Sequence, residues 1–290
     1  MLGLGLRSTQ GPGLSSSATP PSIVTELIGE DFNGSYTNDL LSINPFSSTT
    51  TVKQTSLPAN WAQSFDAVIG TSNPLVANDV TSVGVWGERT VGGIVKNLYP
   101  LGWHSDHNST TSTLTGPSGS PTSRTDDSVA TTTDTTKRVL YTEGSGADSG
   151  MTVNSDRVFL LRSPGVNFST SMTSTSNPVR LELQAHGYGD LIGDLEIWID
   201  NASTSNSTSA VKLFTFQSSS FTQLSESDSY NKISFRISTI DHPTLGSIDV
   251  RTTNDTFYFY IVHLPPESPG QYYWKSDLAI DNFYVDEMSH

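Results

Sequence analysis

Cysteine is absent from this 290-residue sequence, so the chain forms no disulfide and offers no thiolate to a zinc ion. Basic residues are also scarce, with 15 Lys and Arg against 29 Asp and Glu and a formal net charge of -14. Nucleic acid and anionic membranes attract basic surfaces, so we expect neither as a partner. No apolar run approaches the roughly 20 residues of a membrane span. Arg7 interrupts the first apolar residues before they could form the core of a signal peptide.

Short runs rich in β-branched and aromatic residues make up most of the remaining sequence. Segments such as IVTELIGEDF, RVFLLRSP, VKLFTFQ and FYFYIVHL are separated by stretches of Ser, Thr, Gly and Pro. Most of the runs alternate apolar and polar residues with a period of two, which is typical of half-buried antiparallel strands. No segment keeps a helical period over two turns. The sequence therefore predicts an all-β fold, an antiparallel β-sandwich.

Residues 176–201 illustrate the pattern and predict two strands joined by a glycine-rich turn into a β-hairpin. Apolar side chains alternate along both strands, so each strand should press one face on the same core. The core positions are Val179, Leu181, Leu183, Ala185, Leu195, Ile197 and Ile199. The opposite face should be exposed to solvent, and it carries Arg180, Glu182, Gln184, His186, Asp194, Glu196, Trp198 and Asp200.

Two segments lack the apolar residues needed for a core of their own. Residues 1–22 are rich in Gly, Ser and Pro and predict an N-terminal arm, whereas residues 23–290 predict one domain with a long Ser/Thr loop at about residues 104–136. Ordering such an arm costs about 1 to 2 kcal/mol per residue, which burial against a partner could offset. We therefore expect the arm to dock on a neighbouring chain. The docking residues would be Leu2, Leu4, Leu6, Arg7 and Leu14.

Six short motifs follow one another along the chain. They are EDFNG with Asp31 and Phe32, Trp103 with LTGPSGSPTSRTD at 114–126, LYTEGS at 140–145, LLRSP at 160–164, the segment from His186 and Tyr188 to Ile197, and LAIDNFYV at 278–285. In this order they resemble the motifs of MAM domains, the adhesion modules of meprins, neuropilins and receptor tyrosine phosphatases. The resemblance implies a concanavalin-like jelly roll of two antiparallel sheets. The family's cysteines are absent and Asn33 and Asn282 replace acidic residues, which favours a bacterial or phage relative.

The resemblance also implies a structural Ca²⁺ or Na⁺ where the first and last strands of the fold meet. Asp31 and Asp281 match the family positions, and Glu30 and Asn33 lie beside Asp31 in the sequence. Calcium prefers 6 to 8 oxygen ligands, so several of these side chains would have to converge. The alternative is that Asp281 caps a turn or pairs with a lysine. No other cofactor is expected.

Aromatic residues and carboxylates suggest two further kinds of site. Trp103, His186, Tyr188 and Trp198 could form an aromatic platform for a sugar, or they could pack under a loop or against a neighbouring subunit. Asp194 and Glu196 are spaced to share a strand face, as a glycosidase pair would be. A third carboxylate at the spacing found in concanavalin-like glucanases is missing, so a solvated strand face is favoured and no catalytic residue is predicted.

The leading hypothesis is a non-enzymatic structural and interaction protein on the surface of a tailed-phage virion. Such a protein would be a tail fibre or tail accessory, a decoration protein or an adaptor, and its partners would be other virion proteins and copies of itself. The alternative is a carbohydrate-binding adhesion module that recognises host glycan. A glycosidase accessory domain is a further alternative.

Overall fold

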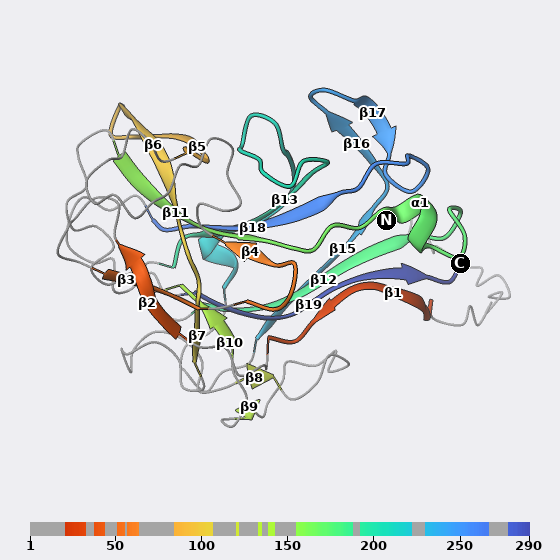
Figure 1. Ribbon diagram of the computed structural model, residues 1–290, viewed down its shortest axis with the longest axis horizontal. Helices are drawn as coiled ribbons and strands as arrows, with labels where there is room; N and C mark the ends of the chain where they lie inside the picture. Colours follow the sequence, from red (N-terminus) through yellow and green to blue (C-terminus); the bar gives the residue numbers. More distant parts are fainter. Residues whose placement is uncertain are drawn as a thin grey trace, which may run out of the picture.

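The computed structural model describes the chain at residues 21–32, 38–43, 51–55, 57–63, 84–106, 120–121, 133–134, 139–142, 155–187, 192–221, 230–266 and 278–290. Within these segments, β-strands make up most of the secondary structure (Figure 1). All but the last two residues of the predicted N-terminal arm lie outside the described residues, and so does most of the predicted loop at 104–136.

Sheet 1 contains six strands in the order β15-β12-β19-β10-β7, and β1 pairs with β19 beside this path. Alternating apolar side chains let these strands bury one face, as the sequence predicted. The strands are β1 (Ile23–Glu30), β7 (His104–Asp106), β10 (Val139–Tyr141), β12 (Val179–Gly187), β15 (Asn231–Ile237) and β19 (Leu278–Met288).

Sheet 2 contains seven strands in the order β14-β13-β18-β11-β6-β5, and β4 pairs with β11. The strands are β4 (Ala62–Gln63), β5 (Gly87–Val91), β6 (Ile94–Leu101), β11 (Ser155–Arg162), β13 (Asp194–Asp200), β14 (Val211–Phe216) and β18 (Tyr258–Leu264). Neighbouring strands of both sheets are antiparallel with the exception of β6 and β11, which are parallel.

Smaller elements lie outside the two sheets. Strands pair in three small ladders, and the β16–β17 hairpin stands at one end of the molecule (Figure 1). A single turn of α-helix begins after Asn167, whose side chain accepts a hydrogen bond from the Thr170 amide at 3.3 Å. These elements are β2 (Asn38–Ile43), β3 (Thr51–Thr55), β8 (Ser120–Pro121), β9 (Thr133–Asp134), β16 (Thr239–His242), β17 (Gly246–Asp249), α1 (Phe168–Ser171) and a 3-10 turn at Ser218–Ser220.

The predicted all-β sandwich is confirmed. The chain passes repeatedly between the sheets, from β11 in sheet 2 to β12 in sheet 1 and back to β13 in sheet 2, and finally from β18 to β19. Such crossings are typical of jelly rolls. The main core lies between the sheets and contains all seven of the core positions predicted for residues 176–201. Removing these side chains from water is the main stabilising contribution to the fold.

The hairpin predicted for residues 176–201 is wrong. β12 pairs with β15 and β19 in sheet 1, whereas β13 pairs with β14 and β18 in sheet 2. The two strands therefore contribute to the same core from opposite sides and share no backbone hydrogen bonds. Alternation of apolar residues specifies which face of a strand is buried, but it does not specify which strand lies alongside.

The prediction that the second face of β12 is exposed is also wrong. Glu182, Gln184 and His186 are at most 2% exposed. Basic side chains lie beside the Glu182 carboxylate, with Arg180 at 3.4 Å and Lys232 at 3.5 Å. The Gln184 side-chain oxygen accepts a hydrogen bond from the Asn282 amide at 2.6 Å. Glu182 and Gln184 can be buried because each is paired with a charged or polar side chain of a neighbouring residue.

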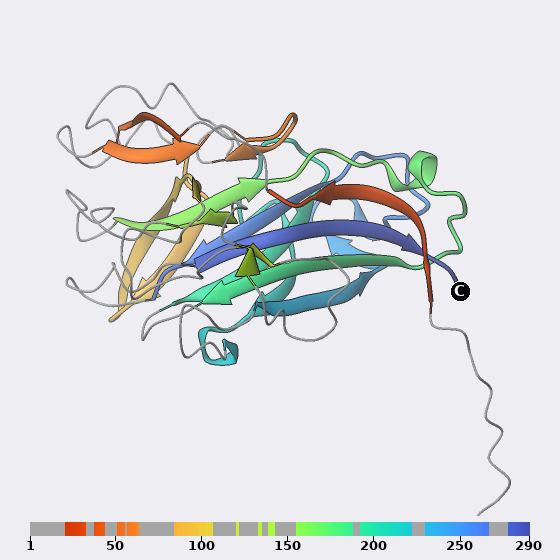
Figure 2. The ribbon, with the colours of Figure 1, turned by 90° about the horizontal axis from the view of Figure 1, so that it is seen from below.

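The first and last strands of the fold run side by side, as the family resemblance implied. Ile23 is opposite Met288, and the start of β1 lies at the same end of the molecule as the C-terminus (Figure 2). Asn282 adopts a positive φ of 53° within β19, where the register with β12 shifts. Asn tolerates this left-handed conformation better than most residues, so it suits this β-bulge.

In the described segments, no helix is long and apolar enough to cross a membrane.

Candidate functional site

An aromatic ring and two opposite charges meet on the outer face of sheet 2. Trp198 on β13 lies opposite Lys212 on β14, and Glu196 precedes Trp198 on the same face of β13. The Trp198 indole nitrogen donates to one Glu196 oxygen at 2.8 Å, and the Lys212 ammonium donates to the other at 2.8 Å. The ammonium also lies 5.2 Å from the centre of the Trp198 ring, within the range of a cation–π interaction. We call these three residues the Trp198 cluster.

Exposure differs among the members of the Trp198 cluster. The Glu196 side chain is 7% exposed, whereas the Lys212 side chain is 45% exposed and Trp198 is half-buried. Because the buried Glu196 accepts a hydrogen bond from the indole nitrogen, its carboxylate holds the Trp198 ring in one orientation. The cluster therefore presents part of an aromatic ring and an exposed ammonium to solvent from two adjacent strands.

A second layer of aromatic side chains supports Trp198 from within the protein. Trp86 is 1% exposed and packs at right angles to Trp198, with ring centres 5.7 Å apart. Tyr260 lies 5.5 Å from Trp86, and its hydroxyl donates to the Ala202 carbonyl at 2.6 Å. Burial, with a smaller contribution from the Asp200 carboxylate, raises the pKa of Tyr260, so this hydroxyl stays neutral.

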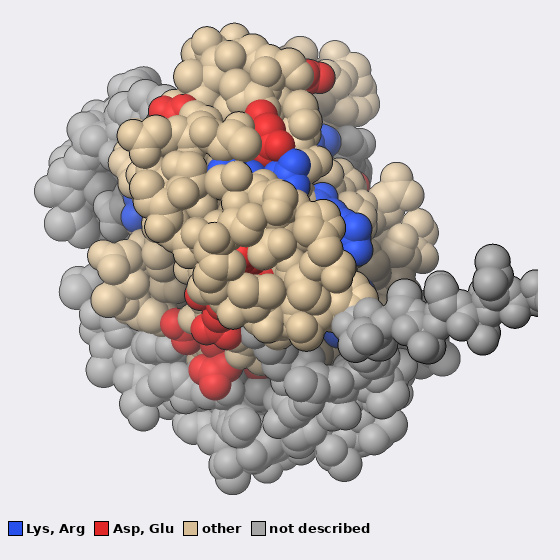
Figure 3. Space-filling model, turned by 90° about the vertical axis from the view of Figure 1, so that its right-hand side faces the viewer, with Lys and Arg blue, Asp and Glu red and all other residues tan. Residues whose placement is uncertain are grey.

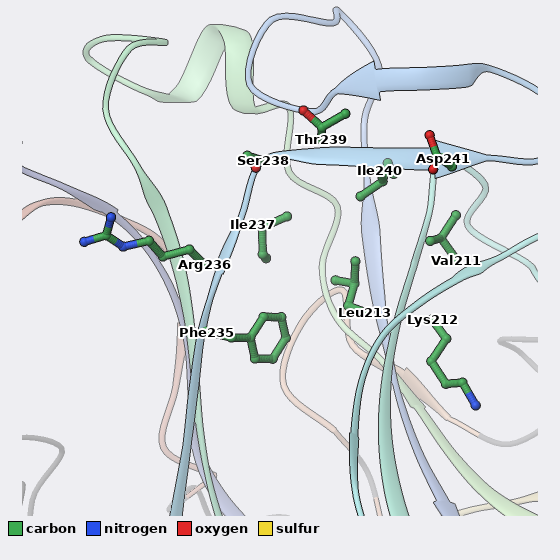
Figure 4. Close-up of a pocket in the computed structure, with 10 residues that line it drawn as sticks. All are labelled: Val211, Lys212, Leu213, Phe235, Arg236, Ile237, Ser238, Thr239, Ile240 and Asp241. Carbon is green, nitrogen blue, oxygen red and sulfur yellow. The ribbon is translucent and has the colours of Figure 1, made fainter.

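A groove opens at the edge of the sandwich, where the outermost strand of each sheet lies. Its volume is about 340 Å³, at the small end of ligand-binding pockets. Figure 4 shows Phe235, Ile237 and Leu213 pointing into the space between β14 and β15, whereas Arg236 and Lys212 point away from it. The residues of this edge groove are Val211, Lys212, Leu213, Phe235, Arg236, Ile237, Ser238, Thr239, Ile240 and Asp241.

A buried polar network fixes β16, which forms one end of the edge groove. The His242 Nε2 atom lies 3.0 Å from the Asp200 carboxylate, and Ser205 donates to the other oxygen of that carboxylate. The His242 Nδ1 atom accepts hydrogen bonds from the Thr244 and Leu245 amides, each at 3.3 Å. Because Nδ1 accepts, the proton resides on Nε2 and is donated to Asp200. This contact connects the end of β13 to the end of β16.

The structure does not bring together the predicted aromatic platform. Trp103 is 0% exposed and belongs to the core between the sheets. His186 is also 0% exposed and packs against Tyr230 on sheet 1, with ring centres 5.4 Å apart. Trp198 lies on the other sheet, and Tyr188 lies outside the described residues. Trp103 and His186 therefore pack inside the protein, which is the alternative that the sequence left open for these aromatic residues.

The predicted metal ligands lie in different environments. Glu30 pairs with Phe283 where β1 meets β19, and one of its carboxylate oxygens accepts from the Phe32 amide at 3.0 Å. Asp31 is exposed, whereas Asp281 is fully buried and accepts from the Asn282 amide at 2.7 Å. Asn33, the fourth predicted ligand, lies outside the described residues. Among the residues that are described, no three acidic or histidine side chains form a group that could hold a metal ion.

The two carboxylates considered as a glycosidase pair are engaged in other contacts. Asp194 accepts from the Ser218 amide at 2.8 Å and thereby caps the 3-10 turn, and Glu196 is held within the Trp198 cluster. Neither residue lines the edge groove. A retaining glycosidase needs one carboxyl free to protonate the leaving group and another free to attack. The contacts of Asp194 and Glu196 suit positioning roles better than catalysis.

On the face shown in Figure 3, the described Lys and Arg side chains gather in a band across the middle, with Asp and Glu side chains above and below it. An ion pair lies at the end of β17. Arg251 donates to the Asp249 carboxylate at 2.6 Å, and this contact lowers the pKa of Asp249. Arg251 also donates to the Asn177 carbonyl at 3.4 Å, which connects the hairpin to the segment before β12.

Sequence reasoning missed Lys212 and the edge groove. Lys212 lies in the segment VKLFTF, whose pattern predicts a strand but does not predict which strand pairs with it. Its position opposite Trp198 depends on a register shift between β13 and β14, next to Ile197. The groove depends on two strands from different sheets that are separated along the chain, so alternation within either strand carries no signal for it.

No family model matches the sequence, and no curated protein matches it. Solved structures with a similar arrangement include the K1 cleaved adhesin domain of Lys-gingipain from Porphyromonas gingivalis W83, at 7% identity and a TM-score of 0.32 over 80% of this chain and 92% of that chain. The CBM22-2 xylan-binding domain of Paenibacillus barcinonensis Xyn10C is 11% identical, with a TM-score of 0.29 over 55% and 84% of the two chains.

A third similar structure is the CBM2 module of the evolved Dit protein from Lactobacillus casei BL23 phage J-1. It is 10% identical, with a TM-score of 0.28 over 64% of this chain and 95% of that chain. These neighbours are adhesin and carbohydrate-binding domains, but similarity at this level supports no functional conclusion by itself. The resemblance to MAM domains stays a prediction.

Proposed function

We propose that this protein is a non-enzymatic carbohydrate-binding module and that the Trp198 cluster contacts the sugar. The observation that carries the proposal is the half-buried Trp198 ring, which Glu196 and Lys212 hold in one orientation on the outer face of sheet 2. The ring lies on strands, so the site needs little reorganisation when a ligand binds.

The chemistry of the Trp198 cluster suits a sugar ring. A pyranose presents C–H groups on its faces, which pack against aromatic rings, and hydroxyls around its edge, which need hydrogen-bond partners. Lys212 supplies donors, and its exposed ammonium can turn from the indole toward a ligand hydroxyl or carboxylate. Glu196 would then keep the indole in place and accept from a second hydroxyl. This division of roles requires no proton transfer and no bond cleavage.

Glycan-array binding by the fluorescently labelled full chain tests the proposal. Arrays of neutral and acidic glycans should give binding to at least one class of sugar. The substitution Trp198→Ala should weaken that binding by about 30-fold or more, because a central aromatic contact contributes at least about 2 kcal/mol. Circular dichroism should show that the variant remains folded.

Tyr284→Ala is the matched control, because Tyr284 is a half-buried aromatic on sheet 1, opposite Glu182. This variant should bind the same sugars as the unaltered chain. A folded full chain that binds no glycan on the array would overturn the proposal. Equal binding by the unaltered chain and Trp198→Ala would place the sugar elsewhere and overturn the assignment of the site.

A second, independent proposal concerns the cellular setting. We propose that the module lies on the surface of a virion and recognises a host glycan from there. Immunogold labelling of purified particles with an antibody to this chain would test the location. Particles without label would contradict it and leave sugar binding by the isolated chain unaffected.

A further inference from the structure

The edge groove lies between β14 and β15, each of which ends one of the two sheets. Among the described residues, β14 pairs only with β13 and β15 only with β12, so one edge of each strand is open. The ladder between β15 and β12 runs without a register shift from Asn231 to Ile237. Proteins often interrupt open edges with bulges or prolines, because a regular edge accepts a further strand. The edge of β15 has neither and is suited to bind one.

The charges on these two strands are all positive, although the chain has a net charge of -14. β14 contains Lys212, β15 contains Lys232 and Arg236, and neither strand contains an acidic residue. Lys212 and Lys232 lie beside the carboxylates of Glu196 and Glu182. Arg236 is exposed, and no carboxylate of a described residue pairs with it. The edge of the sandwich is therefore basic, and a second copy of it would be repelled.

The neighbour of Arg236 within the sheet is another cation. Arg236 is directly opposite Arg180 on β12, and like charges in this arrangement repel each other. Arg180 is compensated by the carboxylates of Asp286 and Glu182. A strand added on the open side of β15 would lie about 4.8 Å away and would place one of its residues directly opposite Arg236. An acidic residue at that position would give Arg236 the counter-charge that its own sheet does not provide.

The residues on either side of Arg236 face the groove. Phe235 and Ile237 point into the space between β14 and β15, whereas Arg236 points away from it (Figure 4). Phe235 stays partly exposed, although its ring stacks on Phe214 with ring centres 5.1 Å apart. Leu213 on β14 also points into this space. Apolar side chains from an added strand would pack on these residues and remove their exposed surface from water.

We propose that the edge groove binds an extended segment of a partner protein, which adds a strand beside β15. An acidic residue of that segment lies opposite Arg236. The apolar residues before and after it lie opposite Phe235 and Ile237 and enter the groove. Backbone hydrogen bonds supply affinity, and the order apolar, acidic, apolar supplies specificity. This site does not include the Trp198 ring, so peptide binding does not depend on the proposed binding of sugar.

Synthetic peptides test the proposal with the full chain. The probe contains the central sequence Thr-Val-Glu-Val-Thr, which is the same in either strand direction, between flanking Gly and Ser residues. In fluorescence anisotropy, this peptide should bind saturably. A peptide with Lys in place of Glu, and one with Gly in place of both Val residues, should each bind at least tenfold more weakly. No saturable binding of the Glu peptide at up to about 1 mM, or equal binding of the Glu and Lys peptides, would overturn the proposal.

A charge reversal tests the role of Arg236. The variant Arg236→Glu should bind the Glu peptide at least tenfold more weakly than the unaltered chain and should prefer the Lys peptide. Lys96→Glu is the matched control, because Lys96 lies on β6 of the other sheet, away from this edge, and this variant should bind like the unaltered chain. Circular dichroism should show that both variants are folded. An unchanged preference of Arg236→Glu for the Glu peptide would assign the peptide to another surface.

Backbone methylation tests whether the peptide binds as a strand. Alternate N–H groups of a strand point to opposite sides, so only one set can pair with β15. Methylation of the two Val nitrogens and methylation of the Thr and Glu nitrogens should therefore differ in effect, with at least a tenfold loss for one set only. Equal losses would overturn strand addition.

Two further measurements distinguish other occupants of the edge groove. Sedimentation should show no dimer that Arg236→Glu dissociates, because such a dimer would assign the edge to a second copy and overturn the proposal. Trp198→Ala should bind the Glu peptide like the unaltered chain. Loss of peptide binding in this variant would assign the peptide to the Trp198 cluster and would also overturn it.

Discussion

The outer faces of the two sheets use charge in different ways. On sheet 1, Glu182 and Asp286 are 1% and 0% exposed, and Arg180 lies 3.4 Å from the first carboxylate and 3.1 Å from the second. On sheet 2, Glu196 is paired with Lys212, whose side chain is 45% exposed, and with the half-buried Trp198. Charges on sheet 1 therefore pair with one another inside the protein, whereas the Lys212 ammonium on sheet 2 remains accessible to a ligand.

This difference separates stability from binding. Breaking a buried ion pair leaves a charge without its partner in a poorly solvated site, so it costs folding free energy. Removing the exposed Lys212 should cost less stability, because Glu196 keeps its hydrogen bond from the Trp198 indole. Substitutions on sheet 1 should therefore lower mainly the free energy of unfolding. Matched substitutions on sheet 2 should weaken mainly the affinity for a sugar.

The largest expected effect is a loss of folding stability in acid, caused by the buried Glu287 near the end of β19. Burial raises the pKa of this carboxyl, but hydrogen bonds from Thr173, Asn177 and Ser174 outweigh burial and lower the pKa from 4.5 to about 2. The folded state therefore binds this proton less readily than the unfolded state. Its contribution of about 3 kcal/mol is present above pH 4.5 and is lost as the pH falls toward 2.

Urea denaturation between pH 6 and pH 2 measures this loss. In the variant Glu287→Gln, the free energy of unfolding should be lower at pH 6 and should fall less steeply below pH 4.5 than in the unaltered chain. An equal slope in both proteins would show that Glu287 does not control acid stability. Sugar binding at pH 6 should be the same in both.

A smaller loss of stability is expected from Arg180→Met. The substitution keeps most of the aliphatic stem but removes the cation from Asp286 and Glu182. Because Arg180 is itself 26% exposed, we expect a decrease of about 2 kcal/mol in the free energy of unfolding rather than the full cost of a buried pair. Urea denaturation at neutral pH measures it.

Arg236→Met is the control for that variant, since Arg236 lies opposite Arg180 on β15 and is exposed. Its effect should stay within about 0.5 kcal/mol. Equal losses in the two variants would contradict the view that the charges of sheet 1 are structural.

The smallest effect on stability is expected from Lys212→Met. Lys212 is 45% exposed and Glu196 keeps its hydrogen bond from Trp198, so the free energy of unfolding should fall by no more than about 1 kcal/mol. Binding of a glycan identified on the array should nevertheless weaken about tenfold, as expected for the loss of a charged hydrogen-bond donor. Lys96→Met on β6 of the same sheet should leave both quantities unchanged. A variant that loses stability but not affinity would reverse the proposed roles of the two faces.

The sequence predicted the sandwich and its core because alternation specifies which face of each strand is buried. Val179 and Leu195 were correctly expected to contact one core. Alternation carries no information on strand partners, so β12 and β13 were wrongly joined in a hairpin although they belong to different sheets. Alternation also predicts that every polar face is exposed. This prediction was wrong for Glu182, which is buried beside Arg180 and Lys232.

The candidate site was predictable only in part. Trp198 was selected as a large aromatic on a polar strand face, and the structure places it at the surface. His186, on the other predicted polar face, and Trp103, which belongs to one of the six motifs, were selected with it, but both are buried. Lys212 could not be linked to Trp198 from sequence, because that contact depends on the register of β13 and β14.

The indole N–H signals of the five tryptophans provide the most direct test of sugar binding at the Trp198 cluster. In a ¹H–¹⁵N spectrum of the full chain, the Trp198 signal can be assigned by its loss in Trp198→Phe. Titration with a glycan that binds on the array should shift this signal in proportion to occupancy and shift the signal of the buried Trp103 little. Saturating glycan that leaves the Trp198 signal in place, or that shifts only the other indoles, would contradict the account.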